Sequence, residues 1–161
     1  MKIAIYPGSY DPITNGHLDI IERSSSLFDK IIVAVARNAE KVSALFSESE
    51  RITMINQSIS HLKNVEVDSF NGLLVDYAAE KNSNAIIRGL RALSDFEFEF
   101  KMALMNRSLK EEISTVFMMP HEKYTHISSS LVKEVASLGG DVSAYVPQHV
   151  EHALQESFSG K

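Results

Sequence analysis

The sequence predicts an α/β fold, a single domain over residues 1–161 built on a doubly wound parallel sheet of five strands. Short apolar runs alternate along the chain with segments of helical periodicity, which is typical of a parallel sheet covered by helices. One of these runs, Lys30–Ala36, is apolar on both faces, as strands buried on both sides usually are. The length of 161 residues suits one domain with a sizeable core.

In the first part of the chain, each of two strands leads into a helix. Lys2–Tyr6 is expected to be a buried strand, followed by an amphipathic helix over Gly16–Phe28. The side chains of this helix that should face the core are Leu18, Ile21, Leu27 and Phe28. After Lys30–Ala36, Ser47 and Glu50 have capping-box spacing and open a second helix, which Asn64 ends. Its apolar stripe is Ile52, Ile55, Ile59 and Leu62.

The second part of the chain continues the alternation. Its expected strands are Val65–Val67, Ala85–Ile87 and Thr115–Met119, and its shorter helices are Leu73–Lys81, 127–138 and 147–157. Residues 94–100 alternate with period two and alone would favour a strand. Because Ser94 is a good N-cap and residues 101–109 are rich in helix formers, we expect one long helix here. Pro147 suits the first position of the last helix.

Composition excludes several classes of site. The chain has no cysteine, so it can form no disulfide, thiolate zinc site or thiol nucleophile. A net charge of −5 argues against general nucleic-acid binding. No apolar run approaches the roughly 20 residues that span a bilayer, and the start of the chain lacks a signal-peptide layout, so we expect a cytoplasmic protein. The histidines are too scattered for a zinc site.

The segment Tyr6–His17 joins the first strand to the first helix and is the strongest candidate for a ligand site. It holds two glycines and two prolines, too long and too rigid for a plain turn. Free N–H groups near Ser9 and at the helix start would bind an anion, and His17 would face it. The alternative is a long connecting loop with a capping histidine.

A second unusual loop, Arg88–Arg91, follows the fourth strand. In the common Rossmann-like strand order 3-2-1-4-5, strands one and four are neighbours, and ligands bind beyond their carboxyl ends. The two loops should therefore meet in one crevice, where arginine holds phosphate well. Lys41 could add a charge, and Ser128–Ser130 at a helix start offers a second anion site. Glu99 could reach a ribose. The alternative for each of these residues is a role without a ligand, as a solvated charge or as a plain serine cap.

These motifs together resemble those of a known family. Thr14–His17 and Ile127–Ser130 are similar to the T/H-x-G-H and I-S-S-S/T signatures of the nucleotidyltransferase superfamily. A fuller match, over essentially the whole chain, resembles the bacterial phosphopantetheine adenylyltransferase family. It rests on the segments 6–17, 87–91, 95–97, 105–107 and 128–134.

The resemblance implies transfer of AMP from ATP to 4′-phosphopantetheine with Mg²⁺, giving dephospho-coenzyme A and pyrophosphate. It implies a homohexamer, coenzyme A as an inhibitor, and His17, Arg91 and Lys41 as catalytic residues. Implied ATP contacts are Ser9, Tyr10, His17, Gly89, Leu90, Arg91, Glu99, Tyr124, Thr125, His126, Ile127, Ser128, Ser129 and Ser130. Implied acceptor contacts are Ser9, Lys41, Leu74, Arg88, Asn106 and Glu134.

The segment Asn38–Phe46 departs from the family pattern N-P-x-K-K-x-x-F, because it has no proline, one lysine and one extra residue. Two alternatives stay open at this point. One is a small nucleotidyltransferase acting on nicotinate mononucleotide or glycerol phosphate. The other is a non-catalytic nucleotide-binding module, against which His17 and Arg91 speak.

Overall fold

The sheet has five parallel strands in the order β3-β2-β1-β4-β5, as the sequence predicts. The computed structural model of the chain describes residues 1–37 and 43–160. Its strands are β1 Ile3–Gly8, β2 Lys30–Ala36, β3 Val65–Phe70, β4 Ala85–Gly89 and β5 Ser114–Met118. Because β1 and β4 are neighbours, the loops that follow them leave the sheet side by side.

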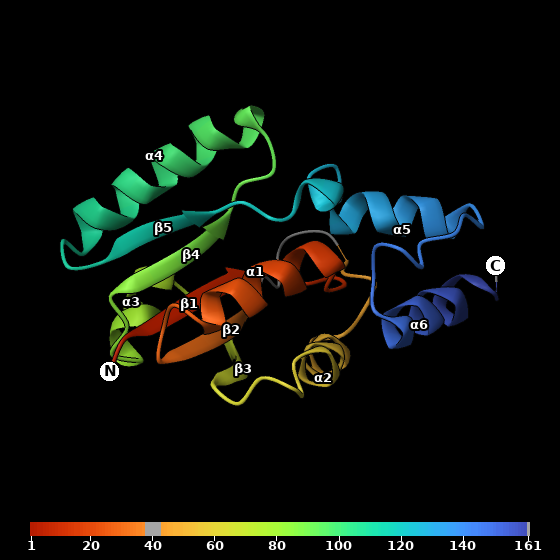
Figure 1. Cartoon of the computed structure of the whole chain (residues 1–161), viewed down its shortest axis with the longest axis horizontal. Helices are drawn as coiled ribbons and strands as arrows, with labels where there is room; N and C mark the ends of the chain where they lie inside the picture. The colour runs from red at the N-terminus through yellow and green to blue at the C-terminus, as the bar shows by residue number, and fades with distance from the viewer. Residues whose placement is uncertain (38–42, 161) are drawn as a thin grey trace.

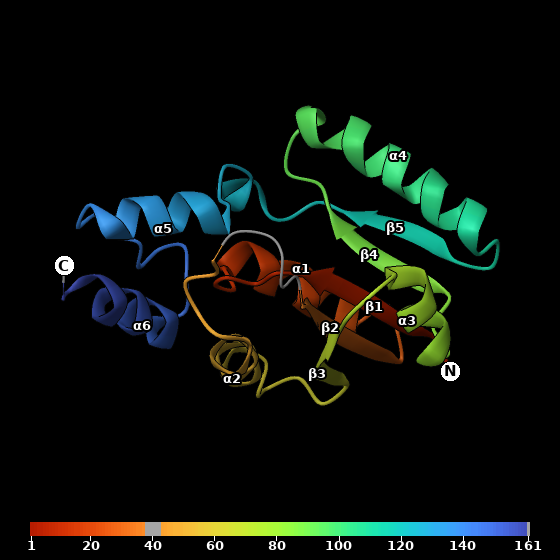
Figure 2. The same ribbon diagram turned by 180° about the vertical axis from the view of Figure 1, so that it is seen from behind.

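Six α-helices accompany the described strands (Figure 1). They are α1 Asn15–Ser25, α2 Glu48–Ser58, α3 Leu74–Glu80, α4 Leu93–Leu109, α5 Ser129–Ser137 and α6 Gln148–Phe158, with a 3₁₀ turn at Glu122–Tyr124. Seen from behind, α5 and α6 lie together at one end of the molecule, and α4 runs beside β5 at the other (Figure 2). In the described part of the chain no helix is both long and apolar enough to cross a bilayer.

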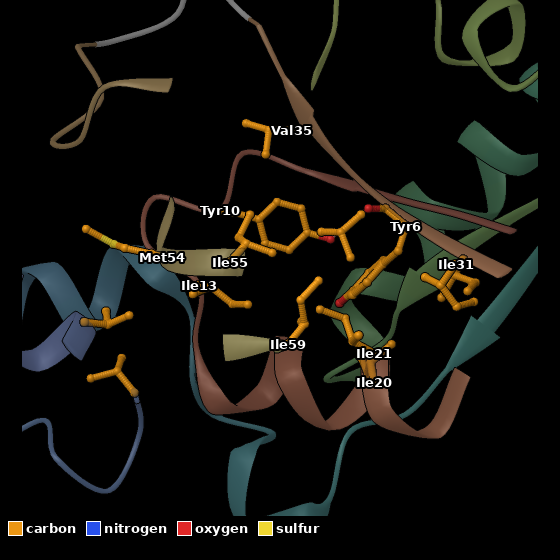
Figure 3. Close-up of a cluster of buried hydrophobic side chains, with 14 of the residues drawn as sticks. Tyr6, Tyr10, Ile13, Ile20, Ile21, Ile31, Val35, Met54, Ile55 and Ile59 are labelled. Atoms are coloured by element: carbon orange, nitrogen blue, oxygen red, sulfur yellow. The ribbon is translucent and has the colours of Figure 1, made fainter. Parts of the chain in front are cut away.

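The strand side chains divide between two cores because successive residues point to opposite faces. Tyr6, Ile31 and Val33 pack with α1, α2, α5 and α6 (Figure 3). Ile5 and Ile32 point the other way, into a smaller core closed by α3. Both faces of the sheet are thus covered, which explains why these strands read as continuous apolar runs.

Several helix ends differ from the sequence-based predictions. Helix α2 ends at Ser58, well before Asn64, where the sequence places its end. Helix α1 ends at Ser25, so Leu27 does not reach the core and is 61% exposed. Helix α4 begins one residue before Ser94, and its N-cap is Ala92, with no side-chain cap. Pro147 is the N-cap of α6 rather than its first residue. Periodicity locates a helix but leaves its ends uncertain by a residue or two, because helix ends fray.

The segment with two conflicting patterns is a helix, as expected. Helix α4 spans Leu93–Leu109, and the rings of Phe96 and Phe100, one turn apart, stack on each other at its surface. Only Glu99 is buried along the whole helix. Large apolar side chains are exposed along it, at Leu93, Phe96, Phe98, Phe100, Met102, Leu104, Met105 and Leu109.

Candidate active site

Two adjoining pockets open beyond the carboxyl ends of β1 and β4. The first has a volume of about 420 Å³ and lies between the strand ends and α4, with Leu74, Phe98 and Asn106 in its lining. The second, of about 350 Å³, lies between the β1–α1 loop and the start of α5. Both are lined by Pro7, Gly8, Ser9, Arg88 and Glu99. The loops after β1 and β4 therefore meet, as the strand order predicts, and form a shared wall.

An ion pair forms the centre of that wall. Arg88 donates from Nε to Glu99 Oε2 at 2.8 Å and from Nη2 to Glu99 Oε1 at 2.7 Å. A third donor, Nη1, lies 3.4 Å from the carbonyl oxygen of Pro7. The bond to Glu99 is the main cause that raises the pKa of Arg88, so this arginine stays charged. Glu99 is only 8% exposed, so its interpretation as one of several acids on a wet face is wrong.

His17 is both a capping residue and a pocket residue. Its Nδ1 accepts a hydrogen bond from the backbone N–H of Thr14 at 3.0 Å, while Thr14 Oγ1 accepts from the His17 N–H at 3.3 Å. This reciprocal pair is a capping box at the start of α1. Because Nδ1 is an acceptor, the neutral ring carries its proton on Nε2. The ring lines the second pocket, beside Tyr10 at a centroid distance of 5.0 Å.

The imidazole of His17 is neutral at physiological pH. Burial is the largest cause, and the positive charges of Arg91 and Arg88 add to it, lowering the pKa of His17 to about 4. Burial and the two arginines, rather than the dipole of α1, are therefore the causes of this low pKa. A neutral imidazole offers one N–H donor without adding a charge.

Arg91 connects the loop after β4 to the start of α5. Its Nη1 donates to the carbonyl oxygen of Ile127 at 3.0 Å, and its Nε lies 3.5 Å from a carboxylate oxygen of Asp95. Arg91 thus lines the second pocket with its orientation set from two sides.

The first turn of α5 closes the opposite side of the second pocket. Ser128 is its N-cap and accepts from the Leu131 N–H at 3.1 Å. The hydroxyl of Ser129 donates to the carbonyl oxygen of Pro12 at 2.7 Å, which ties α5 to the β1–α1 loop. The remaining N–H groups at this helix start favour an anion.

Most of the residues implied for ATP gather in the second pocket. They are Ser9, Tyr10, His17, Gly89, Arg91, Glu99, Tyr124, Ile127, Ser128, Ser129 and Ser130. Tyr10 is buried and its hydroxyl donates to the Tyr6 carbonyl, so its ring forms part of the wall. Leu90, Thr125 and His126 lie outside both pocket linings. The Leu90 N–H donates a hydrogen bond to the carbonyl oxygen of Met118.

Four of the six residues implied for the acceptor line the first pocket. They are Ser9, Leu74, Arg88 and Asn106. Glu134 is an exposed residue of α5 outside both linings. Lys41 lies outside the described residues.

The apolar side chains of α4 that line the first pocket are not among the residues that the sequence motifs indicate. Phe98 and Met102 lie four residues apart and both line it, together with Ala103. Their i, i+4 spacing puts them on one face of a helix and was the signal available. It was obscured because the apolar residues of α4 are spread around most of its surface.

The lining of the second pocket offers two carboxylates, Asp95 and Glu99, toward a magnesium ion that arrives with nucleotide phosphates. Within residues 1–37 and 43–160, no group of three or more acidic or histidine side chains could hold a metal alone. The acids near the phosphate side, Asp95 and Glu99, are paired with Arg91 and Arg88. Mg²⁺ is commonly held by substrate phosphates and water with few protein ligands, so this scarcity is compatible with it.

Comparisons with known proteins agree on the family. The cytidylyltransferase-like family model matches residues 5–135. A phosphopantetheine adenylyltransferase from Desulfosudis oleivorans is 58% identical over 97% of this chain and 92% of that protein. The phosphopantetheine adenylyltransferase from Alkaliphilus metalliredigens is 54% identical over 97% of this chain and 99% of that protein.

Solved structures confirm the Rossmann-like fold. A crystal structure from Vibrio parahaemolyticus matches with a TM-score of 0.70 and 20% identity, over 98% of this chain and 95% of that one. The Plasmodium falciparum nicotinic acid mononucleotide adenylyltransferase, complexed with NaAD, matches with a TM-score of 0.67 and 17% identity, over 96% and 95% of the two chains. At such low identity these matches concern the fold alone. The curated relatives and the family model show that this chain belongs to the phosphopantetheine adenylyltransferase family, within the cytidylyltransferase-like proteins.

Proposed function

We propose that this protein transfers the AMP group of ATP to 4′-phosphopantetheine, giving dephospho-coenzyme A and pyrophosphate. The observation that carries the proposal is the pair of pockets joined at Ser9, Arg88 and Glu99. ATP would bind on the α5 side, and the pantetheine arm would lie against Leu74 and the apolar residues of α4. The two reacting phosphates would then meet at the shared wall.

The chemistry needs no nucleophile from the protein. A phosphate oxygen of the acceptor attacks the α-phosphorus of ATP, a new P–O bond forms, and the bond to the bridging oxygen of the β-phosphate breaks. Pyrophosphate leaves with those electrons. The protein's task is to hold the attacking oxygen, the α-phosphorus and the leaving oxygen in line, and to stabilise the negative charge that develops.

His17 and the two arginines suit that task. The Nε2–H of His17 would donate to an α-phosphate oxygen, and its neutral ring keeps that donor at physiological pH. Arg88 would hold the acceptor phosphate and Arg91 the phosphates of ATP, each already oriented by a carboxylate. Mg²⁺, when bound with ATP, would neutralise phosphate charge.

Self-association is part of the proposal. The exposed apolar residues of α4 would be costly in water if the chain remained alone, and such surfaces commonly mark protein interfaces. A homohexamer follows from the family resemblance. Inhibition by coenzyme A and a cytoplasmic location stay predictions from the sequence.

One assay distinguishes the proposal from its alternatives. Pyrophosphate release from ATP is measured with 4′-phosphopantetheine, nicotinate mononucleotide or glycerol phosphate as the acceptor. We expect release with the first alone, and a product with the mass of dephospho-coenzyme A. Release with another acceptor would favour a different nucleotidyltransferase activity, and binding of ATP without release would favour a non-catalytic module.

A further inference from the structure

The β1–α1 loop holds one buried carboxylate that lines neither pocket. Asp11 is 5% exposed and absent from both pocket linings. Its Oδ1 accepts from the backbone N–H of Phe46 at 2.9 Å. Its Oδ2 accepts from the Leu45 N–H at 2.9 Å and from Lys133 Nζ at 2.8 Å. Both oxygens are therefore engaged, by two segments far from Asp11 in the chain.

These partners belong to opposite sides of the candidate active site. Leu45 and Phe46 lie shortly before α2, whose Arg51 donates to the carbonyl oxygen of Ser9 in the lining of the first pocket. Lys133 lies on α5, one helical turn after Ser129, whose region lines the second pocket. Asp11 thus joins the acceptor side to the nucleotide side.

Two more bonds hold the same loop on either side of Asp11. Arg51 of α2 donates from Nη1 to the carbonyl oxygen of Ser9 at 2.7 Å. Ser129 of α5 donates to the carbonyl oxygen of Pro12 at 2.7 Å. Ser9, which lines both pockets, is thus held directly by α2, and α5 holds the same loop at Pro12.

The charge of Asp11 is favoured by these contacts. Burial alone would raise the pKa of the carboxyl, but the bonds from Lys133, Phe46 and Leu45 outweigh it and hold the pKa below its ordinary value. An ionised carboxylate in this position accepts all three bonds, whereas a neutral amide at the same place could not.

We propose that Asp11 and Lys133 are positioning residues that couple the two substrate pockets. Through this pair, the placement of α5 determines where Ser9 and the end of the β2–α2 connection lie. A change on the nucleotide side should therefore alter acceptor binding, although Lys133 contacts neither pocket. The inference rests on the proposed function, because it assigns the first pocket to the acceptor.

Lys133→Met tests the coupling, since it removes the ammonium group and keeps an apolar stem. We expect the KM for 4′-phosphopantetheine to rise on the order of tenfold, which corresponds to about 1.4 kcal/mol. Lys133→Arg, which keeps a cation, should restore most of the loss. The matched control is Lys30→Met, because Lys30 forms an ion pair with Glu66 at 2.8 Å and is similarly exposed, but lies away from the loop.

A second comparison shows whether the effect passes through Asp11. In an Asp11→Asn background, Lys133→Met should change the acceptor KM little further, because the partner charge is already gone. If Asp11→Asn does not fold, the KM values of Lys133→Met and Lys133→Arg still test the coupling.

Failure of the inference can be told from failure of the proposed function. If the wild-type protein does not transfer AMP to 4′-phosphopantetheine, both fail. If it does, and Lys133→Met lowers the melting temperature like Lys30→Met but has wild-type KM for both substrates, the coupling is wrong and the ion pair only stabilises the fold.

Discussion

Arg88 and Glu99 form a bidentate ion pair on the wall that both pockets share, with N–O distances of 2.8 and 2.7 Å. The arginine comes from the end of β4 and the carboxylate from α4. Glu99 therefore aims the guanidinium of Arg88 between the two pockets, and either residue without the other would leave a partly buried charge unpaired.

Arg88→Ala should weaken 4′-phosphopantetheine binding far more than ATP binding. Loss of a charge-assisted bond costs about 1.5–3 kcal/mol, or roughly tenfold to a hundredfold in Kd. Calorimetry with each ligand measures both effects. Since Glu99 would be left unpaired, the double variant Arg88→Ala with Glu99→Gln is the control for a distorted wall. Equal losses of the two ligands in both variants would contradict the assignment of Arg88 to the acceptor.

His17→Ala should lose turnover and some stability together. Removing one donor to the developing charge typically lowers kcat by about 10²–10³. Because His17 is also half of a capping box, its loss should cost about 1 kcal/mol of stability as well. The loss of stability follows from the two capping bonds between Thr14 and His17.

Glu50→Ala separates the two effects of His17. Glu50 is the corresponding residue of the capping box on α2, is exposed, and lines neither pocket. It should show a similar fall in melting temperature with wild-type kcat. If His17→Ala and Glu50→Ala have the same kcat, His17 is a capping residue and no more.

The neutral histidine should make stability depend on pH. The pKa of His17 is lowered from 6.5 to about 4, so between these values the unfolded chain binds a proton that the folded protein does not. Stability therefore falls as the pH is lowered through this window. Urea unfolding from pH 7 to pH 4.5 should show a steeper loss in the wild type than in His17→Ala. Parallel curves would contradict a neutral imidazole with a lowered pKa.

Ser129→Leu should raise the KM for ATP without unfolding the chain. The larger side chain enters the second pocket and loses the bond to the Pro12 carbonyl. Ser137→Leu, at the exposed far end of the same helix, is the matched control and should leave the KM unchanged. A complex structure with the nucleotide elsewhere would refute the assignment.

Charges introduced among the exposed apolar residues of α4 should disrupt self-association. Leu104→Glu with Leu109→Glu replaces two exposed apolar side chains, and sizing should then show a smaller species than the wild type. Lys101→Glu on the same helix is the control for added negative charge. A wild-type protein that elutes as a monomer would remove the basis for the hexamer.

The element order, the parallel sheet and the meeting of the loops after β1 and β4 could all be predicted from the sequence. These follow from local periodicity and from the handedness of crossovers, which need no knowledge of side-chain packing. The capping box at Ser47 and the start of α5 at Ser128 could also be predicted, because a cap involves residues three apart.

Which charged side chains pair with each other could not be predicted without the folded structure. Asp11 and Lys133 are 122 residues apart, and nothing local marks them as partners. The same holds for Glu99, which sits in a run of alternating acids and phenylalanines yet is buried against Arg88, and for the burial that keeps His17 neutral. Such pairs depend on how whole elements pack, because a charge becomes costly only where packing removes its water.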